Sequence, residues 1–444
     1  MDIGKRTFLK KATLATASLS LPHWLLASAD TDPFVLSNQG CGRATGYAEA
    51  NKIVSTGNMM HVAWLDSAGE GFSVCVRSYD HRTQTWSPTV VVGDGHDNHG
   101  GPALTMDSEG YLHIVYFPHH HAMRYRCSTL PNDSSEWEPE TSFGERLTYP
   151  TLVCGPDDTL YCTCRRSYEH KPWQVELWKK AKDSEWVQVT TLLSSRHLGY
   201  AHFQESLCWS PLDQSLHLAC RYHEKSDGKA YGRLQAIGYL RSNDFGETWT
   251  SWKGSKISLP ATADDLQPLV QGGLEVGRVL RAGHIGVSNV GLPHIAYSLE
   301  IDGKGEAFLA RPDDQGEWHS ISLKSFLPDA YRNWSMIMPG GIVFDQKNRM
   351  YIVAQIHQAG SAQSWGHPTN EIVRLRGDAK GEDFDCSLLS NSNAGIPHWL
   401  PSMERPTGHN FIQGAPAVAF TAGKAGKGNS DILSNDVLIV LDSL

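Results

Sequence analysis

Two histidines, His99 and His119, flank a stretch of the sequence that is typical of a β-hairpin. Apolar runs at 103–106 and 111–116 stand on either side of turn residues 107–110, and this pattern predicts two paired strands. Both histidines are equally distant from the turn, so strand pairing should place them opposite each other to within one residue. Imidazoles held side by side can transfer protons near neutral pH or bind a metal ion. The pair therefore marks a candidate site.

The two hairpins that follow carry ionisable residues at equivalent positions. Tyr149 and Arg165 are equally far from the next predicted turn, and His202 and His223 bracket the turn after that. If these hairpins are neighbours in a ring, the ends away from their tight turns converge on one face. The residues expected there are His99, His119, Tyr149, Arg165, His202, Arg221, Tyr222 and His223.

Hairpin patterns recur along the chain at a spacing of about 50 residues, which is the range of β-propeller blades. The run from Ser242 to Trp249 matches the Asp-box pattern S-x-D-x-G-x-T-W at every fixed position, and weaker copies occur at 80–86, 132–137, 182–186 and 313–318. We predict an all-β, seven-bladed β-propeller with Asp-box (BNR-like) repeats, with six blades as the alternative. The apolar run 436–441 should pair with residues 34–36 and close the ring.

The first 29 residues have the features of a secretory signal peptide: Lys5-Arg6, a short apolar run and a small-residue cleavage pattern at 27–29. Lys5-Arg6 is also close to a twin-arginine motif, so the export route stays open. We expect residues 30–444 to form a single, secreted or periplasmic propeller that is not in the membrane and acts as a monomer.

Charge and cysteine content narrow the function classes. The net charge of −9 argues against nucleic acid as a partner, and an anionic substrate would need a local cluster of Arg and His. Nine cysteines cannot form a fully paired disulfide framework. Cys208 and His217 face each other across a predicted hairpin; a zinc pair is one interpretation, and core packing is the favoured one because zinc needs further ligands.

Several of these stretches together resemble a known family. Residues 98–104, 116–121, 148–151 and 164–166 are similar, in order and spacing, to the BNR-repeat propellers of polysaccharide lyase family 25, the ulvan lyases. The resemblance implies a seven-bladed propeller lyase that cleaves ulvan, a sulfated algal polymer of rhamnose 3-sulfate and uronic acid. It implies a catalytic group of His99, His119, Tyr149 and Arg165, and a structural zinc or calcium ion whose ligands it does not locate.

β-Elimination at a uronate can be performed by these side chains without a cofactor. Arg165 would neutralise the carboxylate, and His99 and Tyr149 would transfer the two protons in an order that the sequence leaves open. His119 would support charge neutralisation or orient its neighbour. The predicted substrate-binding residues are His202, Arg221, Tyr222 and His223.

Two other functions compete with the lyase. A sialidase-type propeller hydrolase would need carboxylates at the site, whereas this face carries mainly His, Tyr and Arg. A non-catalytic carbohydrate-binding propeller would repeat its contacts in every blade, whereas His and Arg are unevenly distributed here.

The individual residues also have purely structural interpretations. A lone histidine at a strand end is usually a surface residue, and Tyr149 could simply pack at a strand start.

Overall fold

The computed structural model describes residues 32–69, 71–224, 234–266, 269–273, 278–359, 366–390 and 395–442. The predicted signal peptide at 1–29 lies outside these residues. Within them the fold is all-β, apart from two short 3-10 helices, η1 (Lys324–Phe326) and η2 (Asp329–Tyr331). In this part of the chain no helix has the length and apolar character needed to cross a bilayer.

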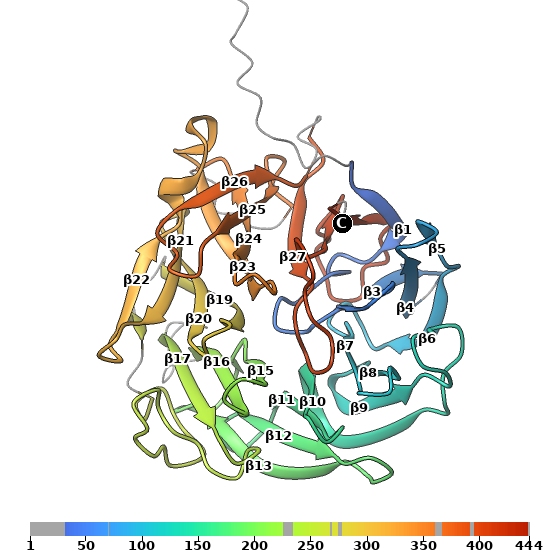
Figure 1. The fold of residues 1–444 in the computed structure, drawn as a ribbon, viewed down its shortest axis with the longest axis horizontal. Coiled ribbons are helices and arrows are strands. Elements are labelled where there is room, and N and C mark those ends of the chain that lie inside the picture. The colour runs from blue at the N-terminus through green and yellow to red at the C-terminus, as the bar shows by residue number, and fades with distance from the viewer. Residues whose placement is uncertain are drawn as a thin grey trace, which may run out of the picture.

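The strands form five sheets arranged in a ring around a common axis (Figure 1). The first sheet has the order β27-β28-β29-β1-β3-β4-β5, with β2 beside β3 and β6 beside β4. Its strands are β1 (Phe34–Gly40), β2 (Ile53–Thr56), β3 (Met59–Ala68), β4 (Gly71–Asp80), β5 (Thr85–Trp86), β6 (Val90–Gly95), β27 (His398–Met403), β28 (Val418–Ala422) and β29 (Asn435–Val440).

The second sheet runs from β7 to β13 in chain order. Its strands are β7 (Ala103–Met106), β8 (Leu112–Tyr116), β9 (His119–Cys127), β10 (Thr141–Cys154), β11 (Leu160–Arg166), β12 (Gln174–Lys180) and β13 (Val187–Ser194).

The three remaining sheets have five, four and four strands. The five-stranded sheet contains β14 (Ala201–His202), β15 (Ser206–Ser210), β16 (Ser215–Glu224), β17 (Leu234–Ser242) and β18 (Val270–Gly273). The four-stranded sheets contain β19 (Arg278–Val287), β20 (Pro293–Ile301), β21 (Lys304–Pro312) and β22 (Trp318–Ser322), and then β23 (Ser335–Phe344), β24 (Met350–His357), β25 (Glu371–Gly377) and β26 (Phe384–Leu388).

The ring is closed by pairing between the first and last strands. β1 pairs antiparallel with β29, and Phe34 lies opposite Ile439, which confirms the closure predicted from the sequence. This pairing gives both terminal strands a hydrogen-bonded neighbour. Apolar side chains fill the space between neighbouring sheets; one core cluster joins Val62 of β3, Leu104 of β7 and Ile439 of β29.

The Asp-box has the structural role that its sequence predicts. Asp244 accepts hydrogen bonds from the backbone N–H (2.8 Å) and hydroxyl (2.6 Å) of Thr248. Gly246 has a φ of +95°, a left-handed conformation that glycine adopts without a steric penalty. Trp249 is fully buried, and its indole N–H donates to the Gly246 carbonyl at 3.1 Å. The motif therefore fixes a turn and anchors it in the core.

Two backbone irregularities position the predicted site residues. β8 ends at Tyr116, and Phe117 has a φ of +91°, so the chain turns sharply and His119 begins β9 instead of extending β8. In β10 the register shifts between Thr148 and Thr151, and Tyr149 has a φ of +60°. A bulge of this kind changes the direction of a side chain.

Candidate active site

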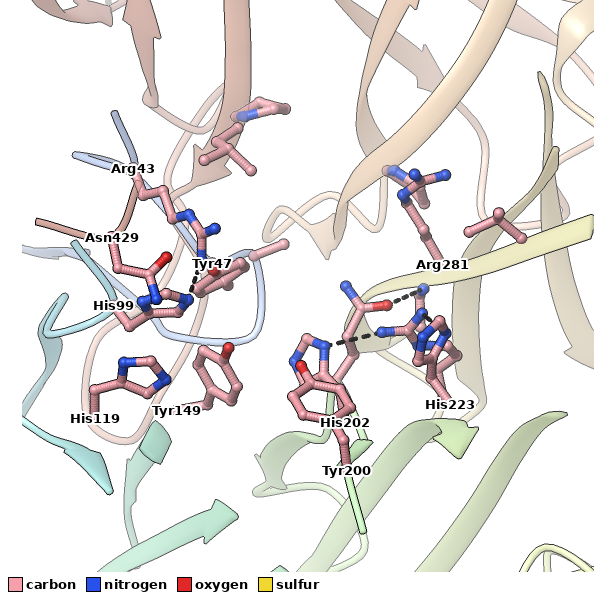
Figure 2. Close-up of a pocket in the computed structure, with 18 residues that line it drawn as sticks. Arg43, Tyr47, His99, His119, Tyr149, Tyr200, His202, His223, Arg281 and Asn429 are labelled. Carbon is pink, nitrogen blue, oxygen red and sulfur yellow. Dashed lines mark hydrogen bonds between the residues drawn. The ribbon is translucent and has the colours of Figure 1, made fainter. Parts of the chain in front are cut away.

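A cavity of about 520 Å³ contains most of the residues singled out from the sequence (Figure 2). Its lining includes His99, His119, Tyr149, His202, Arg221 and His223, together with Arg43, Tyr47, Tyr200 and Arg281. In Figure 2 these side chains form two groups, one around His99 and Tyr149 and the other around His202 and His223. Among the described residues that line the cavity there is no carboxylate.

The histidine pair predicted from the hairpin is confirmed as a pair of neighbours. The His99 and His119 rings stack with their centroids 4.0 Å apart. Asp97 lies behind both rings: its Oδ1 is 3.0 Å from Nδ1 of His99, and its Oδ2 is 2.6 Å from Nδ1 of His119. An ionised carboxylate can only accept hydrogen bonds, so both Nδ1 atoms carry a proton that they donate to Asp97. Nε2 of His99 contacts the Arg43 guanidinium, which can only donate, so this nitrogen accepts.

The charge states of this group follow from burial and hydrogen bonding. Burial lowers the pKa of His99 to about 4, against the raising effect of the Asp97 hydrogen bond. Although burial alone would raise the pKa of Asp97, the hydrogen bonds from His119 and His99 hold it well below its usual range. At neutral pH His99 is therefore a neutral imidazole held by an ionised carboxylate.

Tyr149 lines the cavity beside His99 and is only 5 % exposed. Its ring is 4.9 Å from that of Tyr47, 6.0 Å from that of His99 and 4.6 Å from that of His202, measured between centroids. Burial raises the pKa of Tyr149 well above its ordinary value, Tyr47 raises it further, and the positive charges of Arg165 and Arg43 lower it. The phenol is therefore protonated at neutral pH.

Arg165 does not reach the cavity, which corrects its expected role as a carboxylate clamp. The residue is fully buried, and its guanidinium lies over the Tyr149 ring at 4.6 Å from the centroid, a cation–π distance. One nitrogen donates to the Ala201 carbonyl at 3.4 Å. In this position the guanidinium can stabilise negative charge on Tyr149, and it is not among the residues that line the cavity.

The second group of the cavity is organised by Arg221. Its guanidinium nitrogens lie 3.0 Å from Nδ1 of His202 and 3.1 Å from Nδ1 of His223. An arginine only donates, so both histidines accept through Nδ1 and carry their proton on Nε2. Burial and the charge of Arg221 lower the pKa of His223 to about 3 and that of His202 well below its ordinary value.

Tyr222 was predicted with these residues and lies elsewhere. Neighbouring residues of a strand point to opposite faces of the sheet, so Tyr222 faces the core while Arg221 and His223 face the cavity. The side chain is fully buried, and its hydroxyl donates to the Ala261 carbonyl at 2.7 Å. This contact makes Tyr222 a core residue.

Five of the site residues named above were not predicted from the sequence: Arg43, Tyr47, Asp97, Tyr200 and Arg281. Arg43 contacts Nε2 of His99 and the Tyr47 hydroxyl, and burial raises the pKa of Tyr47 to about 12. Both residues lie between β1 and β2, outside any hairpin pattern. Asp97 could have been found, because it stands two residues before His99 in the run that marked the site.

Asp97, His99 and His119 have the residue types and proximity of a metal site. Both Nδ1 atoms are already bonded to Asp97, and the Arg43 guanidinium contacts Nε2 of His99. A fixed positive charge at this point opposes binding of a cation. The arrangement fits proton transfer better than metal binding.

The fold and the site together define an all-β, propeller-like protein with a cationic cavity. Residues 59–326, more than half of the chain, match the model of a BNR repeat-containing family. The chain therefore belongs to the BNR repeat-containing family.

Two curated relatives have similar sequences. The chain is 23% identical over 323 residues to "Ulvan Lyase-PL25" of Pseudoalteromonas sp. (strain PLSV), which covers 64% of each chain. It is 25% identical over 267 residues to "Ulvan lyase" of Alteromonas sp. (strain LOR), which covers 51% of this chain and 54% of the relative. The matches thus span less than two thirds of the curated relatives' own length.

Solved structures agree with the fold over most of the chain. A polysaccharide lyase PL25 ulvan lyase bound to -[GlcA(1-4)Rha3S]- matches with a TM-score of 0.67 at 16% identity, covering 91% of this chain and 95% of the other. Polysaccharide lyase Uly1 matches with a TM-score of 0.62 at 13% identity, covering 93% and 99%.

Proposed function

We propose that this protein is a polysaccharide lyase that cleaves ulvan by β-elimination at its uronate residues. The observation that carries the proposal is the cavity itself, in which a neutral histidine held by Asp97 lies beside a protonated, buried tyrosine among arginines. The similarity to ulvan lyases supports the choice of ulvan as the substrate.

His99 is the base of the proposed reaction. Its Nε2 takes the C5 proton of the uronate, the electrons form the C4–C5 double bond, and the bond from C4 to the glycosidic oxygen breaks. The contact between Arg43 and Nε2 of His99 must be exchanged for one with the substrate, and Arg43 then neutralises the uronate carboxylate. In this scheme Arg43 takes the role that the sequence assigned to Arg165.

Tyr149 is the acid. Its phenol donates a proton to the departing O4, and the resulting phenolate is stabilised by the Arg165 guanidinium behind the ring. Arg165 is thus a positioning residue, which acts through Tyr149. His119, held by the same carboxylate as His99, supports charge neutralisation at the carboxylate. These steps need no cofactor.

The group around Arg221 suits the second anion of the polymer, the sulfate. Arg221 holds His202 and His223 through their Nδ1 atoms, and its guanidinium gives this side of the cavity a permanent positive charge. Arg281 lines the same side of the cavity and forms an ion pair with Glu300 at 3.2 Å. A substrate with one carboxylate and one sulfate per repeat can then satisfy both groups at once.

The two competing functions are less well supported by the site. A hydrolase of the two-carboxylate type needs acidic groups on both sides of the glycosidic bond, and the described lining residues contain none. A carbohydrate-binding module has no need for a protonated tyrosine next to an Asp-held histidine.

The direct test is incubation with purified ulvan while the ultraviolet absorbance of unsaturated uronate is followed. We expect absorbance and reducing ends to rise together. Reducing ends without absorbance would show hydrolysis, and binding without either change would show a carbohydrate-binding protein; both results contradict the proposal. Desulfated ulvan is expected to raise KM more than it lowers kcat.

Asp97→Asn should lower kcat by about 10²–10⁴-fold with little change in KM, since the amide no longer fixes the Nδ1–H tautomer of His99. Steady-state kinetics on ulvan measure both constants. The exposed Asp313, which pairs with His319 at 2.7 Å, provides a matched control: Asp313→Asn should keep the wild-type rate. An Asp97→Asn variant with the wild-type kcat would show that Asp97 is not required for catalysis.

We further propose that the five sheets comprise seven blades. The first part of β10 pairs with β9 and its second part with β11, so this strand belongs to two blades. The nine-stranded sheet divides where β1 and β3 meet at a single register pair, Gly40 opposite Asp66.

We also propose, from residues 1–29, that the protein is exported to the periplasm or the medium, and that it acts there as a monomer.

A further inference from the structure

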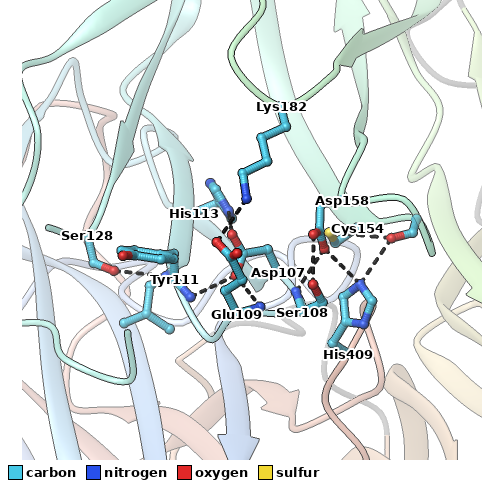
Figure 3. Close-up of polar contacts among 12 residues, drawn as sticks. Asp107, Ser108, Glu109, Tyr111, His113, Ser128, Cys154, Asp158, Lys182 and His409 are labelled. Carbon is cyan, nitrogen blue, oxygen red and sulfur yellow. Dashed lines mark hydrogen bonds and ion pairs between the residues drawn. The ribbon is translucent and has the colours of Figure 1, made fainter. Parts of the chain in front are cut away.

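A second cluster of ligand-type side chains lies away from the cavity, at the turn between β10 and β11 (Figure 3). Cys154 ends β10, and Asp158 lies in the turn. His409 comes from the segment 404–417, which connects β27 to β28. Tyr149 and Cys154 are five positions apart in β10, about 17 Å along an extended strand. We propose that Cys154, Asp158 and His409 form a zinc site that fastens the 404–417 segment to the β10–β11 turn.

The distances between the three side chains suit a tetrahedral ion. One ligand atom from each residue lies within 4.8 Å of the other two. His409 Nε2 is 3.1 Å from Asp158 Oδ1, whereas two such ligands on a tetrahedral zinc ion are about 3.3 Å apart. The Gly155 carbonyl oxygen is 3.1 Å from His409 Nε2 and 3.7 Å from Cys154 Sγ, and this oxygen or a water completes the set of four.

The types of the three donors select zinc. A thiolate, an imidazole and a carboxylate are each common zinc ligands, while calcium and magnesium prefer oxygen alone. Cys154 is fully buried, whereas the His409 and Asp158 side chains are 26% and 15% exposed, so an ion can enter from solvent.

The surrounding charges also favour a cation. Burial, and then the negative charges of Asp158, Asp107 and Asp157, raise the pKa of the Cys154 thiol. The same negative field attracts a divalent ion, whose charge stabilises the thiolate in return. Asp158 is already oriented by a neighbour, because its two oxygens accept from the backbone N–H (2.8 Å) and the hydroxyl (2.7 Å) of Ser108.

The backbone of the 404–417 segment is held against Cys154 before any ion binds. The N–H of Cys154 donates to the Thr407 carbonyl at 2.7 Å. A Cβ on Gly408 would lie 2.7 Å from the Cβ of Cys154, so only glycine permits this close approach. His409 is therefore preorganised beside the thiol, which lowers the entropic cost of assembling the ligands.

The other cysteine–histidine neighbours of the chain are arranged differently. Cys208 and His217 do face each other across β15 and β16, as predicted. His217, however, contacts the Tyr239 hydroxyl at 2.7 Å and Asp213 at 3.3 Å. Among the described residues this pair is not joined by a third ligand, which fits core packing and leaves the Cys154 cluster as the zinc candidate.

The test uses the full chain, loaded with zinc and freed of excess ion by gel filtration. We expect about one zinc per chain by elemental analysis, and none in Cys154→Ser or His409→Ala. Zinc at about a thousand times its Kd should raise the wild-type Tm by about 5 °C and leave both variants unchanged. Cobalt in place of zinc should give a thiolate-to-cobalt absorption band that Cys154→Ser removes.

Matched controls are Cys162→Ser, which replaces another buried thiol, and His319→Ala, which replaces an exposed histidine paired with Asp313. Both should bind zinc as the wild type does. His409→Ala removes a partly exposed side chain, so it tests the site even if Cys154→Ser fails to fold. A wild-type chain without zinc, or zinc retained by His409→Ala and lost in His99→Ala, would overturn the proposal.

Discussion

Tyr149→Phe is expected to lower kcat on ulvan by about 10²–10⁴-fold, because the variant has no proton to give the departing oxygen. KM should change little, since the ring and its contacts remain. The measurement is the rate of unsaturated-uronate formation at saturating substrate. The lost hydroxyl should cost only about 1 kcal/mol of stability, so a thermal melt will separate a chemical defect from an unfolded protein.

Tyr222→Phe is the matched control for this experiment. Tyr222 is also a fully buried tyrosine with a hydrogen-bonded hydroxyl, but it faces the core. Its variant should lose a similar amount of stability and keep the wild-type kcat. A wild-type kcat in both variants would show that Tyr149 is not the proton donor, and a different donor would then be required.

The second prediction concerns the acid limb of the pH profile. His99 accepts a proton only when neutral, so kcat/KM should rise with pH through the His99 pKa and reach half its plateau at about pH 4. An unperturbed histidine would place that midpoint near 6.5. His99→Ala should lower kcat by about 10²–10⁴-fold across the whole range. The measurement is the initial rate on ulvan between about pH 3.5 and 8, a range that contains both possible midpoints.

Stability must be followed over the same pH range. The pKa of His99 is lower in the folded protein than the usual 6.5 of an unfolded chain, so the unfolded state binds the proton first. Stability from this group is present above about pH 6.5 and decreases as the pH falls toward 4. Chemical denaturation at each pH separates this loss from the catalytic limb. A midpoint near 6.5 in a fully folded protein would contradict the lowered pKa of the buried His99, and loss of that acid limb in His99→Ala is the check on its role as the base.

Much of the fold could be predicted from the sequence because each repeat carries its own local signals. The turn residues, the alternating strands and the Asp-box from Ser242 to Trp249 are short-range patterns, and the structure contains each of them. The pairing of β1 with β29 was predictable because two otherwise unpaired edge strands remained at the ends of the pattern. His99 and His119 do meet as predicted, although neither lies in the β7–β8 ladder, and Asp97 holds both rings.

The errors at the site have identifiable physical causes. Tyr222 was grouped with Arg221 and His223 by position along the chain, although alternation along a strand puts it on the other face. Arg165 and Tyr149 were predicted to be neighbours because they are equally far from the turn, and the structure confirms that they are in contact. The sequence did not predict that the Arg165 guanidinium would be fully buried. A register shift in β10 intervenes, and such a shift leaves no pattern in the sequence. Arg43 and Tyr47 lie in an irregular segment, where no periodic pattern in the sequence indicates which way the side chains point.

The closure of the ring by β1 and β29 has a consequence for when the proposed activity can appear. Arg43 and Tyr47 follow directly after β1, and Asn429, just before β29, lines the same cavity. The seam that closes the ring therefore also completes the cavity, and it joins segments from the two ends of the described chain. The segment that carries Arg43 also has a second anchor, because the Leu65 N–H of β3 donates to the Ala44 carbonyl at 3.0 Å. A chain whose C-terminal strand has yet to be made, or has been cut away, would keep that anchor but lack Asn429 and the partner of β1. The proposed turnover is then expected to reach its full rate only with the last strand in place, so that activity would report completed folding.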